Sequence, residues 1–118
     1  MWNRGRPPVR PMKPVVIKIG GEVVADPARL SLVLDELAWL GAQGRPAVLC
    51  HGGGPQARAL GQRLGLEQKK VAGQRVTDAA TLEVVTAVLA GTANVSVVQA
   101  ARAAGLRAVG LDGVSAGL

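Results

Sequence analysis

Residues 51–55 read His-Gly-Gly-Gly-Pro, and these three glycines in a row are the part of the sequence best suited to chemistry on an anion. The apolar run 47–50 precedes them, and a stretch with helical character over 55–64 follows. Glycine lets the backbone approach an anion closely, and a helix N-terminus adds free N–H groups and the positive end of its dipole. The pattern predicts that the glycines at 52–54, Gly52 and Gly53 among them, bind a phosphoryl group or an anionic substrate, and a tight strand-to-helix turn is the plainer alternative.

A second glycine pair follows another apolar run, because residues 15–21 read Val-Val-Ile-Lys-Ile-Gly-Gly. Lys18 stands among apolar residues near the end of this run, where its ammonium group either reaches solvent or contacts an anion. With Gly20 and Gly21 beside it, contact with a phosphate is the favoured interpretation. A positive charge there would stabilise a phosphoryl group during its transfer.

Four other residues each have two interpretations. Arg75 could hold a carboxylate through two parallel hydrogen bonds or be a solvated arginine, and the sequence leaves both open. For His51, a structural role at a strand end is favoured over a general base, because no nucleophile or paired carboxylate is placed to use it. Asn94 could contact a ligand or cap a kink. Cys50 lies in an apolar run and is predicted to be an inert core thiol.

Composition limits the class of protein. With 118 residues, 48% of them apolar, the chain is predicted to form one domain with a core. Trp2 and Trp39 are the only aromatic residues, too few for a platform that stacks single-stranded nucleic acid. The net charge is +6, but four basic residues lie in positions 1–13, and ten basic and eight acidic residues share the remainder, a net charge of +2. We therefore expect no nucleic-acid partner.

Cys50 is the only cysteine, which excludes an intrachain disulfide and a cysteine-cluster metal site, and we expect no metal site in the protein. No run is judged long enough to span a bilayer, and residues 1–13 lack the apolar core of a secretory signal. We expect a soluble, cytoplasmic protein without membrane contact.

The elements that must position these residues follow from hydrophobic spacing and from capping residues. Residues 1–13 are predicted to be a disordered basic, proline-rich tail, with Met12 as an alternative start. The predicted strands are 15–19, 47–50 and 108–111, with a hairpin at 69–77. The predicted helices run from Pro27, capped by Asp26, to Gly41 or Gly44, then over 55–64 with Gly65 as a stop, and over 79–104, capped by Asp78 or Thr77 and kinked or broken at Gly91.

Short apolar strands that alternate with helices predict an α/β fold with a mainly parallel sheet flanked by helices. Ligands in such sheets bind outside the carboxyl ends of the strands. Both glycine runs follow predicted strands, so we expect them to open onto the same edge of the sheet.

Five ordered runs give the chain a resemblance to the acetylglutamate kinases of the amino acid kinase superfamily. These runs are Ile-Lys-Ile-Gly-Gly at 17–21, His-Gly-Gly-Gly-Pro at 51–55, Gly-Gln-Arg-Val-Thr at 73–77, Leu-Ala-Gly-Thr-Ala-Asn at 89–94 and Ala-Val-Gly-Leu at 108–111. The resemblance covers about 14–118. It implies a three-layer sandwich that phosphorylates the side-chain carboxylate of N-acetyl-L-glutamate, with ATP and Mg²⁺.

The resemblance also assigns roles. Lys18 is expected to stabilise the transferred phosphoryl group, and Arg75 to clamp the α-carboxylate of the substrate. The hairpin at 69–77 is expected to act as a lid, and the 79–104 helix to form a homodimer interface. The expected backbone donors to phosphate and substrate are Gly20, Gly21, Gly52 and Gly53.

Members of this family are more than twice as long as this chain, and their second half carries most of the nucleotide pocket. We therefore expect residues 14–118 to be the N-terminal, acyl-amino-acid-binding half, inactive alone. Two alternatives stay open: a kinase for the longer homologue N-acetyl-aminoadipate, and a non-catalytic module that binds acylated amino acids or a regulator. Ser115 stands where many relatives have an aspartate.

Overall fold

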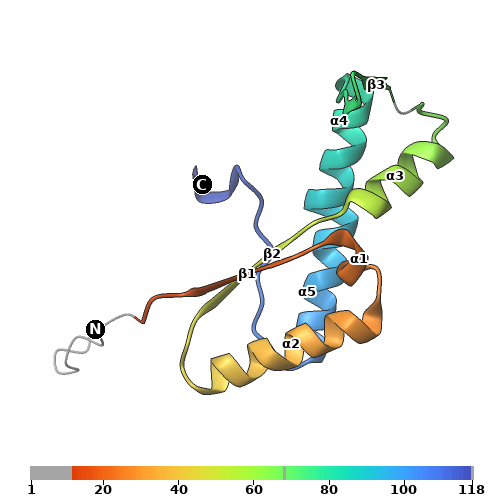
Figure 1. The fold of residues 1–118 in the computed structure, drawn as a ribbon. Helices are drawn as coiled ribbons and strands as arrows, with labels where there is room; N and C mark the ends of the chain where they lie inside the picture. The colour runs from red at the N-terminus through yellow and green to blue at the C-terminus, as the bar shows by residue number, and fades with distance from the viewer. Residues whose placement is uncertain (1–11, 68, 118) are drawn as a thin grey trace.

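The computed structural model describes residues 12–67 and 69–117, so most of the predicted tail, 1–11, lies outside the described residues. A parallel pair of strands, β1 (Val15–Ile19) and β2 (Ala47–His51), crosses the middle of the molecule (Figure 1). Valine and isoleucine favour such pleated, partly buried strands. The ladder aligns Val15 with Ala47 at one end and Ile19 with His51 at the other.

Two helices follow β1. α1 (Gly21–Val24) is a single turn, which the sequence did not lead us to expect, and two residues separate it from α2 (Pro27–Ala42). Asp26 caps α2 as predicted, because its Oδ1 accepts hydrogen bonds from the N–H groups of Ala28 at 3.0 Å and Arg29 at 3.2 Å. The buried residues of α2 recur at helical spacing and are Leu30, Leu34 and Leu37.

Three consecutive segments form one long rod: α4 (Ala79–Thr86), the π-helical turn η1 (Ala87–Thr92) and α5 (Ala93–Ala103) (Figure 1). Asp78 is the residue that caps it, because its Oδ1 accepts the N–H of Thr81 at 2.9 Å. The buried positions along the rod are Val84, Val88, Ala93, Val97 and Ala101.

The π-helical turn keeps those buried positions on one side of the rod. They are four residues apart except between Val88 and Ala93, which are five apart and span the turn. In an α-helix, a step of five residues would rotate Ala93 by about 140° away from Val88. A π-helical turn absorbs one extra residue, so Ala93 returns to the buried side. Of the two alternatives predicted at Gly91, a kink or a break, the break is wrong, because the helix continues through this residue with altered winding.

The two faces of the sheet have different surroundings. Ile17 and Leu49 pack against a core cluster that contains Ile19, the α2 leucines and Ala101, so α2 and α5 cover this face. On the opposite face, Val16 is 66% exposed and Val48 is 48% exposed. The predicted α/β class is confirmed, and the described residues supply a helix layer on one face of the sheet.

The predicted helix after the second strand and the predicted hairpin are also present. α3 (Gly54–Arg63) follows β2 and ends before Gly65, whose φ of 71° is the left-handed conformation expected of a helix stop. A second small core joins α3 to the long rod through Ala57, Val84, Val88 and Ala93. The strands β3 (Lys70–Val71) and β4 (Gln74–Arg75) form an antiparallel hairpin. A single 3₁₀ turn, η2 (Ser115–Gly117), lies near the end of the chain.

Two further expectations from the sequence are wrong. Residues 108–111 are not a strand within the described part of the chain, because they share no ladder with β1 or β2, although Ala108 packs against the core. Ala79–Ala103 is a helix of 25 residues, long and apolar enough to cross a membrane by length and composition alone, contrary to the expectation that no run has this length. The core helix of a soluble protein meets the same criterion, and Val88 and Val97 of this helix are buried.

Candidate functional site

The two glycine loops meet at the carboxyl edge of the sheet, as predicted. β1 and β2 are parallel neighbours, so the loops that follow them start side by side. The N–H of Gly52 donates to the carbonyl of Ile19 at 2.9 Å and extends the strand pairing into the loop. A Cβ atom on Gly21 would lie 2.7 Å from Pro55 Cδ and 3.0 Å from Gly53 Cα. The backbones therefore approach each other so closely that only glycine fits at position 21.

Free N–H groups lie at the start of α3. Gly53 occupies the N-cap position without a side-chain cap, and Gly54 is the exposed first residue of the helix. Within residues 12–67 and 69–117, no acceptor bonds the N–H of Gly53 or Gly54. Such unpaired donors, at the positive end of a helix dipole, favour an anion. Gly54 belongs to the glycine run at 52–54 that was predicted to bind an anion, although the family resemblance assigned it no role of its own.

The predicted glycines differ in whether their N–H groups are free and in how exposed they are. The N–H of Gly52 donates to the carbonyl of Ile19 in this structure, so it is not a free donor here. Gly21 and Gly53 are buried, and Gly20 is exposed. A Cβ atom on Gly53 would lie 2.9 Å from Leu89 Cδ2, so the π-helical turn packs directly on this loop.

Lys18 lies on the open face of β1, directly beside Cys50 of β2. Both residues are exposed, because the described helices cover the other face of the sheet. The prediction of Cys50 as a core thiol is therefore wrong. Within the described part of the chain, no carboxylate lies within 4.0 Å of the Lys18 ammonium group. The structure thus places an unpaired positive charge two residues before Gly20.

His51 and Asn94 join the end of β2 to the first turn of α5. The His51 ring places Nδ1 3.2 Å from the Gly52 carbonyl and Nε2 3.4 Å from Asn94 Oδ1. A Cβ atom on Gly110 would overlap the Asn94 amide. These contacts agree with the structural role favoured for His51. They also show that the Asn94 side chain contacts His51 and Gly110 of the same chain.

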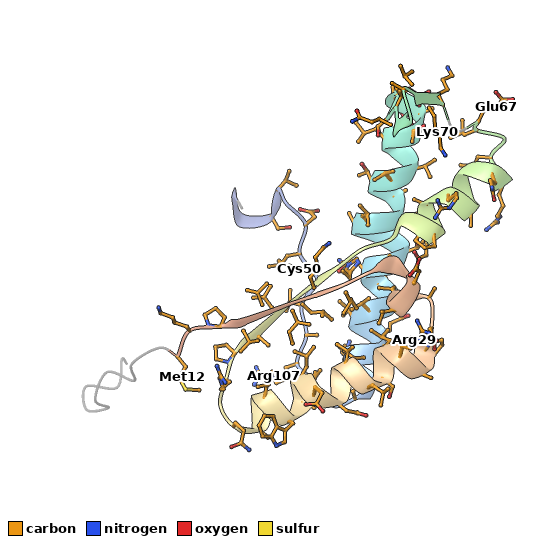
Figure 2. The ribbon with its side chains drawn as sticks, in the orientation of Figure 1. Met12, Arg29, Cys50, Glu67, Lys70 and Arg107 are labelled. Atoms are coloured by element: carbon orange, nitrogen blue, oxygen red, sulfur yellow. The ribbon has the colours of Figure 1, made fainter. Side chains whose placement is uncertain are left out.

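The hairpin stands apart from the glycine loops. Figure 2 shows Lys70 at the end of α4 that lies away from Cys50 and the sheet. Arg75 pairs with Lys70 through its backbone, and the side chain of Arg75 lies outside the described part of the structure. The structure therefore brings Lys18 and the glycine loops to one edge of the sheet but does not bring the hairpin backbone there.

The base of the hairpin is tied to the start of α4. The N–H of Val76 donates to the carbonyl of Lys69 at 3.0 Å, and Lys69 Nζ lies 4.0 Å from Asp78 Oδ2. Hydrogen bonds from the Thr81 hydroxyl and the Thr81 N–H hold the pKa of the Asp78 carboxyl below its ordinary value, and the Lys69 charge acts in the same direction. These contacts connect the base of the hairpin to the start of α4.

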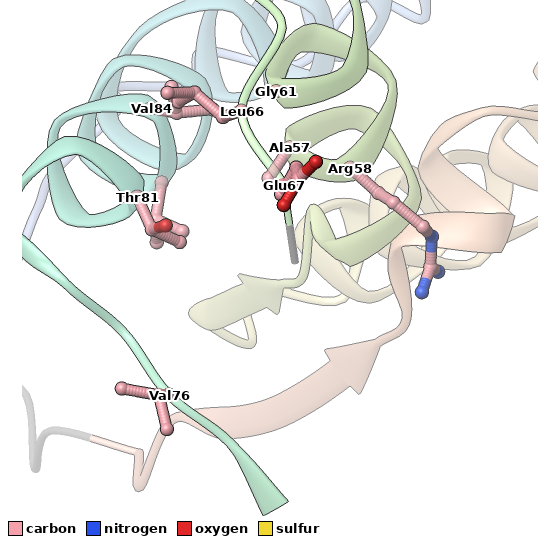
Figure 3. A pocket seen from close by; sticks show the side chains of 9 residues that line it. Ala57, Arg58, Gly61, Leu66, Glu67, Val76, Thr81 and Val84 are labelled. Carbon is pink, nitrogen blue, oxygen red and sulfur yellow. The ribbon is translucent and has the colours of Figure 1, made fainter. Parts of the chain in front are cut away.

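A pocket lies between this base, α3 and α4 (Figure 3). Ala57 and Gly61 contribute from α3, and Thr81 and Val84 from α4, with Val76 on the segment after the hairpin. Its other lining residues are Arg58, Leu66, Glu67 and Val85. The pocket is mainly apolar, and it lies next to the element predicted to be a lid.

Comparison with known proteins gives a family. Residues 13–118 match the model of the amino acid kinase family. The chain is 53% identical over 102 residues to an acetylglutamate kinase of Sorangium cellulosum, a match that covers 86% of this chain and 36% of the relative. It is 49% identical to an acetylglutamate kinase of Anaeromyxobacter dehalogenans, covering 88% of this chain and 38% of the relative. It is 44% identical to one of Methanopyrus kandleri, covering 87% and 38%. The chain therefore spans a little over a third of the length of these curated relatives.

Proposed function

Because this chain belongs to the amino acid kinase family, we propose that it is the N-terminal, acyl-amino-acid-binding part of a kinase that phosphorylates the side-chain carboxylate of N-acetyl-L-glutamate. The product would be an acyl phosphate on the route to arginine. The observation that carries the proposal is the meeting of two glycine loops at one sheet edge, next to the unpaired charge of Lys18.

Phosphoryl transfer depends mainly on positioning and on stabilising the charge of the transferred group. In the proposal, the N–H groups of Gly53 and Gly54 bind oxygens of the transferred group, and Gly20 and Gly21 form the facing wall. Lys18 supplies positive charge to the same oxygens. Gly52 contributes close approach, since its N–H is already bonded within the sheet.

Substrate recognition is assigned to the hairpin. Arg75 would bind the α-carboxylate of N-acetyl-L-glutamate through its guanidinium group, which fits a planar carboxylate. The hairpin would close as a lid over the substrate by moving toward the sheet edge from the position seen in Figure 1. The support for this step is the Gly-Gln-Arg-Val-Thr run at 73–77 and the presence of the hairpin.

The residues at the site fit phosphate oxygens better than a metal ion. Free N–H groups and a lysine bind anionic oxygen. No three His, Cys, Asp or Glu side chains gather among the described residues, so we assign no Mg²⁺ ligand in this part of the chain. ATP with Mg²⁺ is the proposed phosphoryl donor, and Mg²⁺ would neutralise phosphate charge when bound.

We further propose a cytoplasmic homodimer that pairs through the long rod 79–104. Leu82 is 55% exposed and Val95 is 52% exposed, more apolar surface than a solvated helix requires. Light scattering of the complete protein tests this assignment. A monomer at micromolar concentration would remove it.

The activity is tested by trapping the acyl phosphate with hydroxylamine. We expect the complete protein to convert N-acetyl-L-glutamate in an ATP-dependent reaction, and the 118-residue chain alone to give no product. N-acetyl-aminoadipate is assayed in parallel. A higher kcat/KM for that longer substrate would move the assignment to the aminoadipate kinase, and no turnover with either would favour the binding module.

A further inference from the structure

The Gln56 side chain connects the two glycine loops. Gln56 lies in the first turn of α3, and its Nε2 donates to the carbonyl of Gly21 at 2.7 Å. The same carbonyl accepts the N–H of Ala25 at 2.9 Å, within the single turn of α1. One side chain thus ties the first turn of α3 to the first turn of α1, across 35 residues of sequence.

The Gln56 side chain is closely packed at this connection. The Gln56 amide lies close against the backbone of Gly21, since a Cβ atom there would be 2.8 Å from Gln56 Oε1. Oε1 itself is buried and has no hydrogen-bond partner among the described residues. A buried acceptor without a donor is unfavourable. The glutamine is therefore held with one half of its amide unsatisfied, while the other half bonds the opposite loop.

We propose that Gln56 is a positioning residue, which fixes the distance between the two glycine loops so that both act on one phosphoryl group. This inference rests on the proposed kinase function. The N–H donors are those of Gly53 and Gly54 at the start of α3. Gly20 and Gly21, which follow Lys18 in the sequence, form the facing wall. An error of about 1 Å in such an arrangement can reduce the rate on the order of 100-fold. Without the Gln56 bond, no hydrogen bond joins α1 to α3 among the described residues, and packing alone holds the two turns together.

Gln56→Met tests this role, because methionine has a similar length and removes both the donor and the unsatisfied acceptor. Gln56→Glu keeps the shape but places a carboxylate oxygen against the Gly21 carbonyl. Gln62→Met is the matched control, since Gln62 is an exposed residue of the same helix. All variants are compared in the complete protein by kcat and KM, and by the fraction folded.

We expect both Gln56 variants to lower kcat roughly 10-fold to 100-fold, with each KM changed less than about threefold. Amide hydrogen exchange of Ala25 should become faster in Gln56→Met, because the turn that its N–H closes is no longer held. Gln62→Met should match the wild type in every measurement.

Two results would overturn the inference: a Gln56→Met enzyme with the kcat of the Gln62→Met control, or a loss of kcat fully explained by unfolded protein. If the wild-type protein phosphorylates neither acylated amino acid, the proposed function fails independently. Hydrogen exchange then decides about Gln56 alone: faster exchange at Ala25 supports the connection between the loops, and unchanged exchange refutes it.

Discussion

His51 Nε2 lies 3.4 Å from Asn94 Oδ1, and this contact joins the end of β2 to the first turn of α5. The two residues are separated by 43 positions in the sequence. Each is half-buried, and Gly110 lies close to the Asn94 amide. Asn94 is therefore a link between the sheet edge, the long rod and the segment after it.

Replacing Asn94 with alanine should lower stability by about 1 kcal/mol, the usual net value of one hydrogen bond. The neighbouring Ser96→Ala serves as the control, because Ser96 is exposed and bonds only the Thr92 carbonyl within its own helix. Urea unfolding of the two variants measures the difference. Equal midpoints for both would show that the His51 contact adds nothing to stability.

Deleting Ala90 should leave the chain able to fold. The deletion removes the extra residue of the π-helical turn, so Val88 and the shifted Ala93 become four residues apart and stay on the same side of an α-helix. Deleting the exposed Val95 should cost at least about 2 kcal/mol more, because it rotates Val97 by about 100° out of the core. Circular dichroism during urea unfolding compares the two. Similar losses of stability in the two variants would mean that the π-helical turn does not determine which residues of the rod face the core.

Much of the fold could be predicted from local chemistry. Asp26, Asp78 and Gly65 act at helix ends through their own backbone preferences, and the structure has them in these positions. The π-helical turn could not be predicted, because it results from packing between Val88 and Ala93 on a shared core. The exposure of Lys18 and Cys50 likewise depends on which sheet face is covered, and hydrophobic spacing alone does not show that.

At the candidate site, the sequence predicted which loops would meet but not how their atoms are used. Glycine runs after two apolar strands were sufficient to place both loops at one edge. The bond from Gly52 to Ile19 and the reach of Gln56 to Gly21 depend on strand register, which no local pattern contains. A polar residue directly after Gly-Gly-Gly-Pro was the one available signal for Gln56.

Lys18→Ala should lower kcat of the complete protein on the order of 100-fold and change KM much less. A positive charge at a phosphate site matters most when charge moves in the transition state. Stability should stay within about 0.5 kcal/mol of wild type, because Lys18 is exposed. The control is Lys13→Ala, because Lys13 is also exposed and also precedes Gly20 in the sequence. A normal kcat in Lys18→Ala would show that Lys18 is a solvated lysine without a role in the reaction.

Ala72→Gly should make the hairpin more stable. Ala72 has a φ of 50° and Gly73 a φ of 77°, so both turn residues adopt the left-handed conformation that a type I′ hairpin requires. A side chain in this conformation costs roughly 1 kcal/mol. Hydrogen exchange of the Val76 N–H, which closes the hairpin, should slow about fivefold. Gly73→Ala adds a second strained residue and should speed the same exchange, and a shift in the same direction for both variants would contradict the assignment.

Arg75→Lys should weaken the binding of N-acetyl-L-glutamate and spare the binding of ATP. A guanidinium group can form two parallel bonds to a carboxylate, and an ammonium group keeps only one contact. A lost hydrogen bond to a charged group costs about 1.5–3 kcal/mol, so KM for the acylated amino acid should rise roughly 10-fold to 100-fold. Arg63→Lys, at an exposed position near the end of α3, controls for the general effect of replacing an arginine. Because the hairpin lies away from the glycine loops, equal increases in both KM values would show that Arg75 supports the fold and does not bind the substrate.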